Sequence, residues 1–336
     1  AITIAQGSLY VDSGASVTDN VDVGLVATVT GVVNSAQVGV YTLSYSALDT
    51  AGNAAQVITR TVTVTDQTKP VITLLGQSPY TLALGTGWVD PGVQVIDNVD
   101  NSLQASITGT VNTTLIGSYI LSYNAVDSAG NVALTVTRIV NVKDLTPPVI
   151  TLNGASAITI AQGSLYVDSG ASVTDNVDVG LVATITGAVN SAQLGVYTLS
   201  YSALDTAGNA AQVITRTVTV TDQTKPVITL LGQSPYTLAL GTGWVEPGAQ
   251  VVDNVDKALQ ATITGTVNTT LIGSYILSYN AVDSAGNVAL TVTRTVNVKD
   301  LTPPVITLNG ASAITIAQGS LYVDSGASVT DNVDVG

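Results

Sequence analysis

Apolar residues alternate with threonine, serine and asparagine along most of the chain. Between residues 118 and 126, Tyr119, Leu121, Tyr123 and Ala125 are separated by single residues, two of which are polar. A period of two is typical of a half-buried β-strand. Valine and threonine dominate the other segments of this kind, and both suit the pleated surface of a sheet. No segment has the 3.6-residue period of a helix, so we predict an all-β protein.

The stretch from residue 70 to residue 144 shows the predicted order of strands. Turn sequences such as Gly-Gln-Ser-Pro and Asp-Ser-Ala-Gly-Asn divide it into short segments. About seven short strands with a turn every 8–12 residues predict a β-sandwich. The clearest strands are expected at 71–75, 80–84, 93–96, 105–108, 118–126 and 134–142.

The sequence repeats itself, and the repeat defines domains better than the chain length does. The first 24 residues recur after 156 residues and again after 312, and Val-Ile-Thr-Leu recurs every 78 residues, each time after a proline. We predict five units of about 78 residues or less, at 1–66, 70–144, 148–222, 226–300 and 304–336. The first of these lacks an opening strand and the last is also partial, as expected of an excerpt from a longer array. An alternative is that the two partial units complete each other between molecules by strand donation.

Composition excludes several classes of function. Histidine, cysteine, methionine and phenylalanine are absent, so disulfides, thiol chemistry, imidazole bases and most zinc or copper sites are excluded. A net charge of −14 argues against nucleic acid or an anionic membrane as a partner. No apolar stretch approaches the roughly 18 residues of a membrane span. The first residues lack the regions of a signal peptide, so we expect targeting information outside this sequence.

The acidic residues occupy only five positions of the repeat. These are an aspartate after an aromatic–valine pair, both acids of Asp-Asn-Val-Asp, the first residue of Asp-x-Ala-Gly-Asn, and an aspartate in the linker. Each of the four units up to residue 300 carries five acids and the last segment carries three, which accounts for all 23. A merely solvated surface would scatter its acids, so this pattern indicates a specific role.

The ordered motifs resemble a known family. The succession PPVITLNG, YVDSGASVTDNVD, GVYTLSYSALDTAGN and TRTVTVTD is similar to bacterial immunoglobulin-like surface repeats, a group that includes hyalin-repeat-like modules. The resemblance implies an Ig-like sandwich, export to the cell surface, and service as a stalk or adhesive array. Four tyrosines resemble the tyrosine-corner position of that fold, although its disulfide and its core tryptophan are absent: Tyr41, Tyr119, Tyr197 and Tyr275.

The implied topology brings four of the five acidic positions together. In an Ig-like sandwich, the loop after the second strand, the loop between the last two strands and the incoming linker lie at one pole. Crowded carboxylates repel one another unless a cation neutralises them or they take up protons. Carboxylate, amide and carbonyl oxygens form the ligand set that calcium prefers over magnesium. The alternative is that these residues only shape turns.

We therefore predict one structural calcium site at each junction between repeats. An ion shared by a linker and the following unit would remove hinge freedom and stiffen an extended rod. The first three sets are Asp66, Asp97, Asp100, Asp127 and Asn131; Asp144, Asp175, Asp178, Asp205 and Asn209; and Asp222, Asp253, Asp256, Asp283 and Asn287. A fourth set begins with Asp300, Asp331 and Asp334.

Catalysis is not expected. Paired carboxylates could form a glycosidase pair, but equivalent copies without cleft-building insertions argue against one. Serine and threonine are plentiful but have no evident base beside them. The leading hypothesis is a non-catalytic extracellular array, a calcium-stiffened stalk or filament of a bacterial surface protein or adhesin. Its partners would be neighbouring repeats and identical chains in a fibre.

The alternative function is a repeated binding module. Weak carbohydrate or protein sites, one per unit, would gain avidity on a host or matrix surface, with Trp88 and Tyr166 as candidate aromatic contacts. Two further patterns recur. Asn112 and Asn268 begin N-glycosylation patterns. One arginine lies on an otherwise apolar strand face in each unit, and we expect a structural ion pair or a stem at the sandwich margin: Arg60, Arg138, Arg216 and Arg294.

Overall fold

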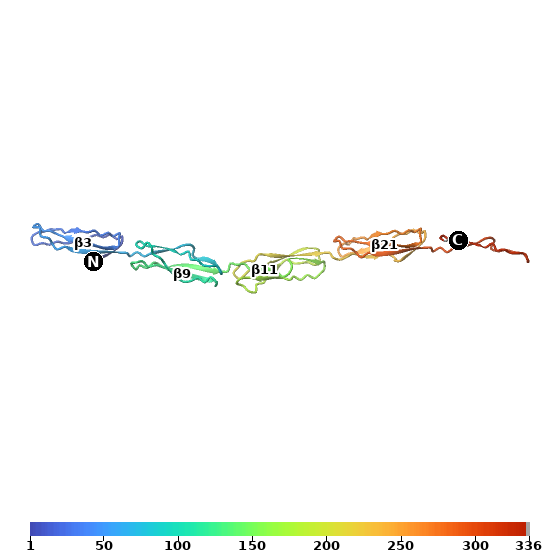
Figure 1. Ribbon diagram of the computed structural model, residues 1–336, viewed down its shortest axis with the longest axis horizontal. Helices are drawn as coiled ribbons and strands as arrows, with labels where there is room; N and C mark the ends of the chain where they lie inside the picture. Colours follow the sequence, from blue (N-terminus) through green and yellow to red (C-terminus); the bar gives the residue numbers. More distant parts are fainter. Residues whose placement is uncertain (334–336) are drawn as a thin grey trace. The chain divides into compact units, whose positions relative to one another are not determined.

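A computed structural model describes residues 1–333 of the chain, and these residues form strands and turns without a helix (Figure 1). The contacts divide the chain into two compact units. The first unit comprises residues 1–148 together with the loops 175–179 and 204–210. The second comprises the other residues from 149 onward. Both of these units contain repeats of the same kind of β-sandwich.

The second repeat shows the architecture most completely in the first unit. Its strands are β5 (Val71–Leu74), β6 (Tyr80–Ala83), β7 (Val93–Ile96), β8 (Ser106–Thr108), β9 (Gly117–Asn124) and β10 (Val136–Lys143). One sheet has the order β6-β10-β9-β8 and the other pairs β5 with β7. Strand β10 runs parallel to β6 and antiparallel to β9. The chain thus changes sheet after β5, β6 and β7, which produces the predicted sandwich.

The other repeats follow the same order. The third has β11 (Val149–Leu152), β12 (Ala157–Ala161), β13 (Ala171–Thr174), β14 (Thr184–Thr186), β15 (Gly195–Ser202) and β16 (Ile214–Thr221). The fourth has β17 (Val227–Leu230), β18 (Tyr236–Ala239), β19 (Ala249–Val252), β20 (Thr262–Thr264), β21 (Gly273–Asn280) and β22 (Val292–Lys299). Residues 1–66 form one four-stranded sheet from β1 (Ile2–Ala5), β2 (Thr28–Thr30), β3 (Gly39–Ser46) and β4 (Ile58–Thr65). A final pair joins β23 (Val305–Leu308) to β24 (Ala327–Thr330).

Each core lies between the two sheets and follows the predicted alternation. On β9, Leu121 and Tyr123 are buried, whereas Ile120 between the corner tyrosine and Leu121 is exposed. On β10, Val140 and Val142 are buried in the same way. Ile72 closes the core from the opposite sheet. Removing this apolar surface from water is the main favourable term in folding, and the all-β sandwich prediction is confirmed.

One predicted strand begins later than expected. Leu134 fits the alternation of the last strand, yet β10 starts at Val136 and the Leu134 side chain is 80% exposed. The turn after Asp127 continues further than its Gly-Asn signal suggests, because Ala133 N still bonds to Ala125 O at 2.9 Å. This backbone bond closes the loop and leaves Leu134 outside the sandwich.

The tyrosine corners form as the resemblance implied. Tyr119 Oη donates to the carbonyl of Leu115, four residues upstream, at 2.8 Å. The equivalent tyrosines do the same: Tyr41 to Gln37, Tyr197 to Gln193 and Tyr275 to Leu271. Each bond ties the long strand to the loop that precedes it and satisfies a carbonyl that no ladder partner reaches.

Candidate metal centre

Carboxylates gather where a linker meets two loops of the following repeat. At the junction between the first and second repeats, Asp66 follows β4, Asp97 follows β7, and Asp127 begins the turn after β9. One oxygen of each lies within 4.8 Å of the others. The fold achieves this because β5 starts, and β7 and β9 end, at the same pole of the sandwich.

The same arrangement occurs at two more positions. Among residues 1–333, the three groups that meet this distance are Asp66, Asp97 and Asp127; Asp144, Asp175 and Asp205; and Asp222, Asp253, Asp256 and Asp283. All of these except Asp175 and Asp256 are buried, with exposed fractions between 4% and 9%. Ten predicted ligands are therefore brought together in three clusters.

Each cluster contains buried carboxylate oxygens that no hydrogen bond satisfies among the residues the structure describes. They are Asp66 Oδ2 and Asp97 Oδ1; Asp144 Oδ2 and Asp175 Oδ1; and Asp222 Oδ2 and Asp253 Oδ2. A buried charged oxygen without a partner is costly, and native proteins rarely leave one. Six such atoms occur as two per cluster, which is the donor set expected where a hard cation binds.

The other oxygen of each carboxylate holds its own loop in shape. Asp97 Oδ2 accepts from the backbone N–H groups of Val99 and Asp100 at 2.9 and 3.0 Å. Asp66 Oδ1 accepts from Thr68 N at 3.0 Å and from Asn98 Nδ2 at 3.1 Å. These turns, which are typical of aspartate, aim the remaining oxygens at the centre of the cluster. Within Asp66 and Asp97, one carboxylate oxygen thus forms the turn and the other faces the cluster.

Hydrogen bonds keep several of these acids ionised. Burial opposes the ionisation of Asp127, but donation from Asn131 outweighs it, and the pKa of this carboxyl lies below its ordinary value. The same balance lowers the pKa of Asp205 beside Asn209. For Asp253, the backbone N–H groups of Asp256 and Val255 are the main cause of a lowered pKa. One acid in each cluster therefore stays ionised at neutral pH.

Two predicted ligand positions have other contacts in the structure. Asp100 lies outside the first cluster, and its Oδ2 accepts from Ser128 N at 2.7 Å, which joins the two loops. Asp178 holds Thr206 in the same way. The reason is local, because the last residue of the Asp-Asn-Val-Asp turn faces the Asp-x-Ala-Gly-Asn turn of the same repeat. Within residues 1–333, this position belongs to a cluster in the fourth repeat alone, as Asp256.

The amides point their nitrogen atoms toward the acids. Asn131 Nδ2 donates to Asp127 Oδ2 at 2.7 Å and to the Asp66 carbonyl at 3.4 Å. Asn209 and Asn287 repeat both bonds. In the structure, these amide nitrogens hold the linker against the loop. The asparagine inside Asp-Asn-Val-Asp, which the sequence did not single out, contributes a further tie from Asn98 to Gln6 at 2.6 Å.

The fourth predicted set is incomplete in the part of the chain that is described. Asp300 Oδ1 accepts from Thr302 N at 3.0 Å, and Asp331 Oδ1 accepts from Val333 N at 2.9 Å. Asp334 lies outside the described residues. The two placed residues shape their turns as their counterparts do.

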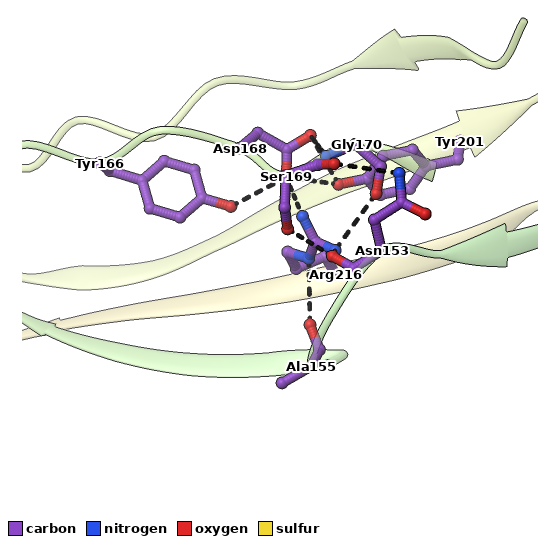
Figure 2. Close-up of polar contacts among 8 residues, drawn as sticks. All are labelled: Asn153, Ala155, Tyr166, Asp168, Ser169, Gly170, Tyr201 and Arg216. Atoms are coloured by element: carbon purple, nitrogen blue, oxygen red, sulfur yellow. Dashed lines mark hydrogen bonds and ion pairs between the residues drawn. The ribbon is translucent and has the colours of Figure 1, made fainter. Parts of the chain in front are cut away.

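The fifth acidic position pairs with the recurring arginine inside the sandwich. In the third repeat, Arg216 is wholly buried, forms an ion pair with Asp168, and donates to the carbonyls of Asn153 and Ala155 at 2.7 and 3.0 Å (Figure 2). Tyr201 Oη donates to the same carboxylate at 2.8 Å. The other pairs are Arg60 with Asp12, Arg138 with Asp90 and Arg294 with Glu246. The predicted ion pair is confirmed, and its carboxylate is one that the sequence did not assign.

The candidate aromatic contacts are used inside the protein. Trp88 packs against both apolar clusters of its repeat and meets Tyr80 edge-on, with ring centroids 5.0 Å apart. Tyr166 packs against the third repeat's core and donates to Asp168 at 3.1 Å. Both rings are half-buried. No helix within residues 1–333 has the length and apolar character to cross a membrane.

Comparison with known families agrees with the fold. Four segments match the model described as "Bacterial surface protein, Ig-like domain": 1–64, 72–142, 150–220 and 228–298. The chain belongs to this family. The description indicates a bacterial surface protein, and the four matches correspond to the four repeated sandwiches.

Similar proteins extend well beyond this chain. Hyalin of Strongylocentrotus purpuratus is 32% identical over 299 residues, covering 80% of the chain and 24% of that protein. Hyalin of Lytechinus variegatus is 29% identical over 294 residues, covering 80% of the chain and 54% of that protein. The chain therefore spans about a quarter and about half of the two hyalins.

Two solved structures show a weaker likeness. Drosophila N-cadherin EC1-4 has a TM-score of 0.28 and 11% identity, with 78% of this chain and 83% of that chain covered. The S-layer protein rSbsC(31-844) has a TM-score of 0.22 and 15% identity, with 92% of this chain and 57% of that chain covered.

Proposed function

We propose that this chain is a non-enzymatic structural array of the bacterial surface whose repeats are locked to one another by calcium. The observation that supports this most directly is the pair of buried carboxylate oxygens without a partner in each of the three described clusters. A cation at that position would satisfy both oxygens and neutralise the repulsion between the ionised acids. Such an ion would hold a linker to two loops of the following repeat, and the proposed function rests on that link.

Calcium suits this donor set better than the other common cations. Every side chain in the clusters offers oxygen, which excludes the nitrogen and sulfur ligands that zinc and copper prefer. Magnesium demands a near-ideal octahedron, keeps several waters and is usually bound by only one or two carboxylates. Three or four converging carboxylates fit the larger and more flexible shell of calcium. Millimolar calcium outside a cell would fill even weak sites.

The proposed ion would act on the linker. Residues 67–69 are all that separate Asp66 from Pro70, and a proline restricts the residue before it. Motion between neighbouring domains is nevertheless the default when little surface is buried. Asp66 belongs to the linker, whereas Asp97 and Asp127 belong to the next repeat, so one ion would hold all three. An array locked in this way would serve as a stiff stalk or filament.

Solution scattering of the whole chain with millimolar calcium, and then with excess chelator, tests the proposal. We expect the radius of gyration and maximum dimension to match a stiff rod in calcium, and the scattering to become that of a flexible chain after chelation. Melting should shift to a lower temperature in parallel. A chain carrying Asp97→Asn, Asp175→Asn and Asp253→Asn should behave in calcium as the parent behaves in chelator.

A matched variant separates the ion from the turns. Asp19→Asn changes the first-repeat counterpart of Asp97, which forms the same turn outside the three clusters, and should leave the calcium response unchanged. If chelator alters neither the scattering nor the melting temperature of the parent chain, the carboxylates are only turn formers and the calcium function is wrong.

A further inference from the structure

One residue distinguishes two otherwise matched loops. The segments 67–156 and 223–312 differ at only seven positions, and one of these is the residue that follows Asp-Asn-Val-Asp. It is Asn101 in the second repeat and Lys257 in the fourth. In the fourth repeat, the Lys257 ammonium donates to the carbonyls of Asp253 at 3.0 Å and Asn254 at 2.6 Å. A fixed positive charge therefore lies on the loop that supplies two acids to the third cluster.

The third cluster is also more crowded than its counterparts. Four carboxylates, including that of Asp256, lie within 4.8 Å there, against three in each of the other clusters. Asp253 has an exposed fraction of only 5%, and its Oδ2 has no hydrogen-bond partner among residues 1–333. The ammonium offsets part of the repulsion among these acids before any ion arrives, so an arriving cation has less repulsion left to relieve.

We propose that Lys257 makes the cluster of Asp222, Asp253, Asp256 and Asp283 the weakest calcium site of the three. This inference rests on the calcium function proposed above. Calcium affinity depends on the charge of its ligand set. Each junction carries the same four aspartates in its linker and two loops, so the positive charge of Lys257 beside the third cluster is the difference in net charge. One unit charge within about 10 Å of a divalent ion in a partly exposed loop changes its affinity by roughly ten-fold.

The consequence is graded release. As the calcium concentration falls, the site after Asp222 empties first, and the linker between the third and fourth repeats becomes a hinge while the other two sites remain filled. A uniform array would instead soften at all junctions over the same calcium range. Lys257 thus sets a calcium range in which the chain bends at one defined place.

The test compares single sites within the whole chain. Asp66→Asn with Asp144→Asn leaves the third site, and Asp144→Asn with Asp222→Asn leaves the first. Titration of each chain with calcium by calorimetry should give a dissociation constant about ten-fold higher for the third site. Adding Lys257→Asn should bring the third site to the affinity of the first, and adding Asn101→Lys should weaken the first by the same factor. Ser102→Ala, which copies Ala258 of the fourth repeat, is the matched control and should change neither.

The outcomes separate this inference from the function on which it rests. If neither single-site chain binds calcium, both the calcium function and the inference are overturned. If both chains bind calcium with equal affinity, or if Lys257→Asn weakens the third site, the calcium function stands and the role of Lys257 is wrong. Circular dichroism of each variant in chelator, unchanged from the parent, shows that the chain is folded in every comparison.

Discussion

Three of the four recurring arginines, Arg138, Arg216 and Arg294, are wholly buried. Arg216 has no exposed surface, its charge is balanced by Asp168, and its other hydrogen bonds go to the carbonyls of Asn153, Ala155 and Gly170. Its guanidinium carbon also lies 5.6 Å from the centre of the Tyr201 ring, within cation–π range. Breaking such a pair by removing one partner is costly, because the other charge stays buried and unpaired.

Asp168→Asn should therefore destabilise the third repeat by about 3 kcal/mol, measured by chemical denaturation. The matched control is Asp90→Glu in the second repeat. The fourth repeat already has Glu246 at this position, where it accepts from Tyr279 and lies 3.1 Å from Arg294 Nε. The control should change stability by less than about 1 kcal/mol. Equal losses for the two variants would contradict the ion-pair account.

Stability should fall at both extremes of pH because of the same group. Burial opposes ionisation of Asp168, but bonds from Tyr201 and Tyr166 and the charge of Arg216 outweigh it, so its pKa lies below 3.8. The stability that it contributes is complete well above pH 3.8 and is lost as the pH falls through the lowered value. Burial and Asp168 raise the pKa of Tyr201 from 10.0 to about 12, so the neutral phenol's contribution is lost as pH rises from 10 through 12. Denaturation across pH should show both declines, and Tyr201→Phe should remove part of the alkaline one.

The sequence predicted which acidic side chains converge, but not which of their atoms face one another. Asp66, Asp97 and Asp127 meet because the fold implied by the motifs brings three chain segments to one pole. The roles of Asp100 and Asn131 depend on which atom faces the centre, and spacing along the chain carries no information about that. The pairing of Arg216 with Asp168 joins residues 48 apart, so it needs the sandwich itself.

At the scale of elements, strand positions follow from the alternation, and turn geometry decides where strands end. The expected strand at 93–96 agrees with β7, and the one at 80–84 differs from β6 by one residue. Leu134 was misplaced because a period of two continues into a loop whose backbone bonds, rather than its side chains, fix the path. The apolar pattern of a short segment carries no information about such backbone hydrogen bonds.

Gly109→Ala should be the most damaging single change in a turn of the second repeat. The backbone of Gly109 has φ of +98°, and an added Cβ would lie 2.3 Å from the Ile120 carbonyl oxygen on β9. Strain and displacement together should cost about 2–4 kcal/mol. Gly87→Ala is the control, since its backbone has no positive φ and nothing lies within 4 Å of the added atom. Thermal melting should show a loss for Gly109→Ala only.

At the scale of the whole molecule, charge is concentrated in loops and linkers while the sheet surfaces carry threonine, serine and valine. On β3, for example, Val40, Thr42 and Ser44 face outward with no charged neighbour on the strand. The junctions therefore hold most of the net charge of −14, and calcium should act mainly there. This distribution is why ion binding, rather than the composition of each sandwich, should govern how the repeats move together.

Calcium should also stabilise each complete repeat against unfolding. An ion that binds only the folded state adds about 2.7 kcal/mol at a hundredfold excess over its dissociation constant. Calorimetric melting in calcium should move to higher temperature, and an equal ionic strength of sodium chloride should not reproduce the shift. A shift of the same size with sodium would mean that general screening of the acids, rather than a specific ion, stabilises the chain.

The most direct test of the central claim is an anomalous difference map from crystals of the chain grown in calcium. We predict three peaks, each at about 2.3–2.6 Å from the carboxylate oxygens of one cluster: Asp66 with Asp97, Asp144 with Asp175, and Asp222 with Asp253. The peaks should be absent from crystals grown in chelator. Well-ordered carboxylates without any peak in millimolar calcium would contradict the account.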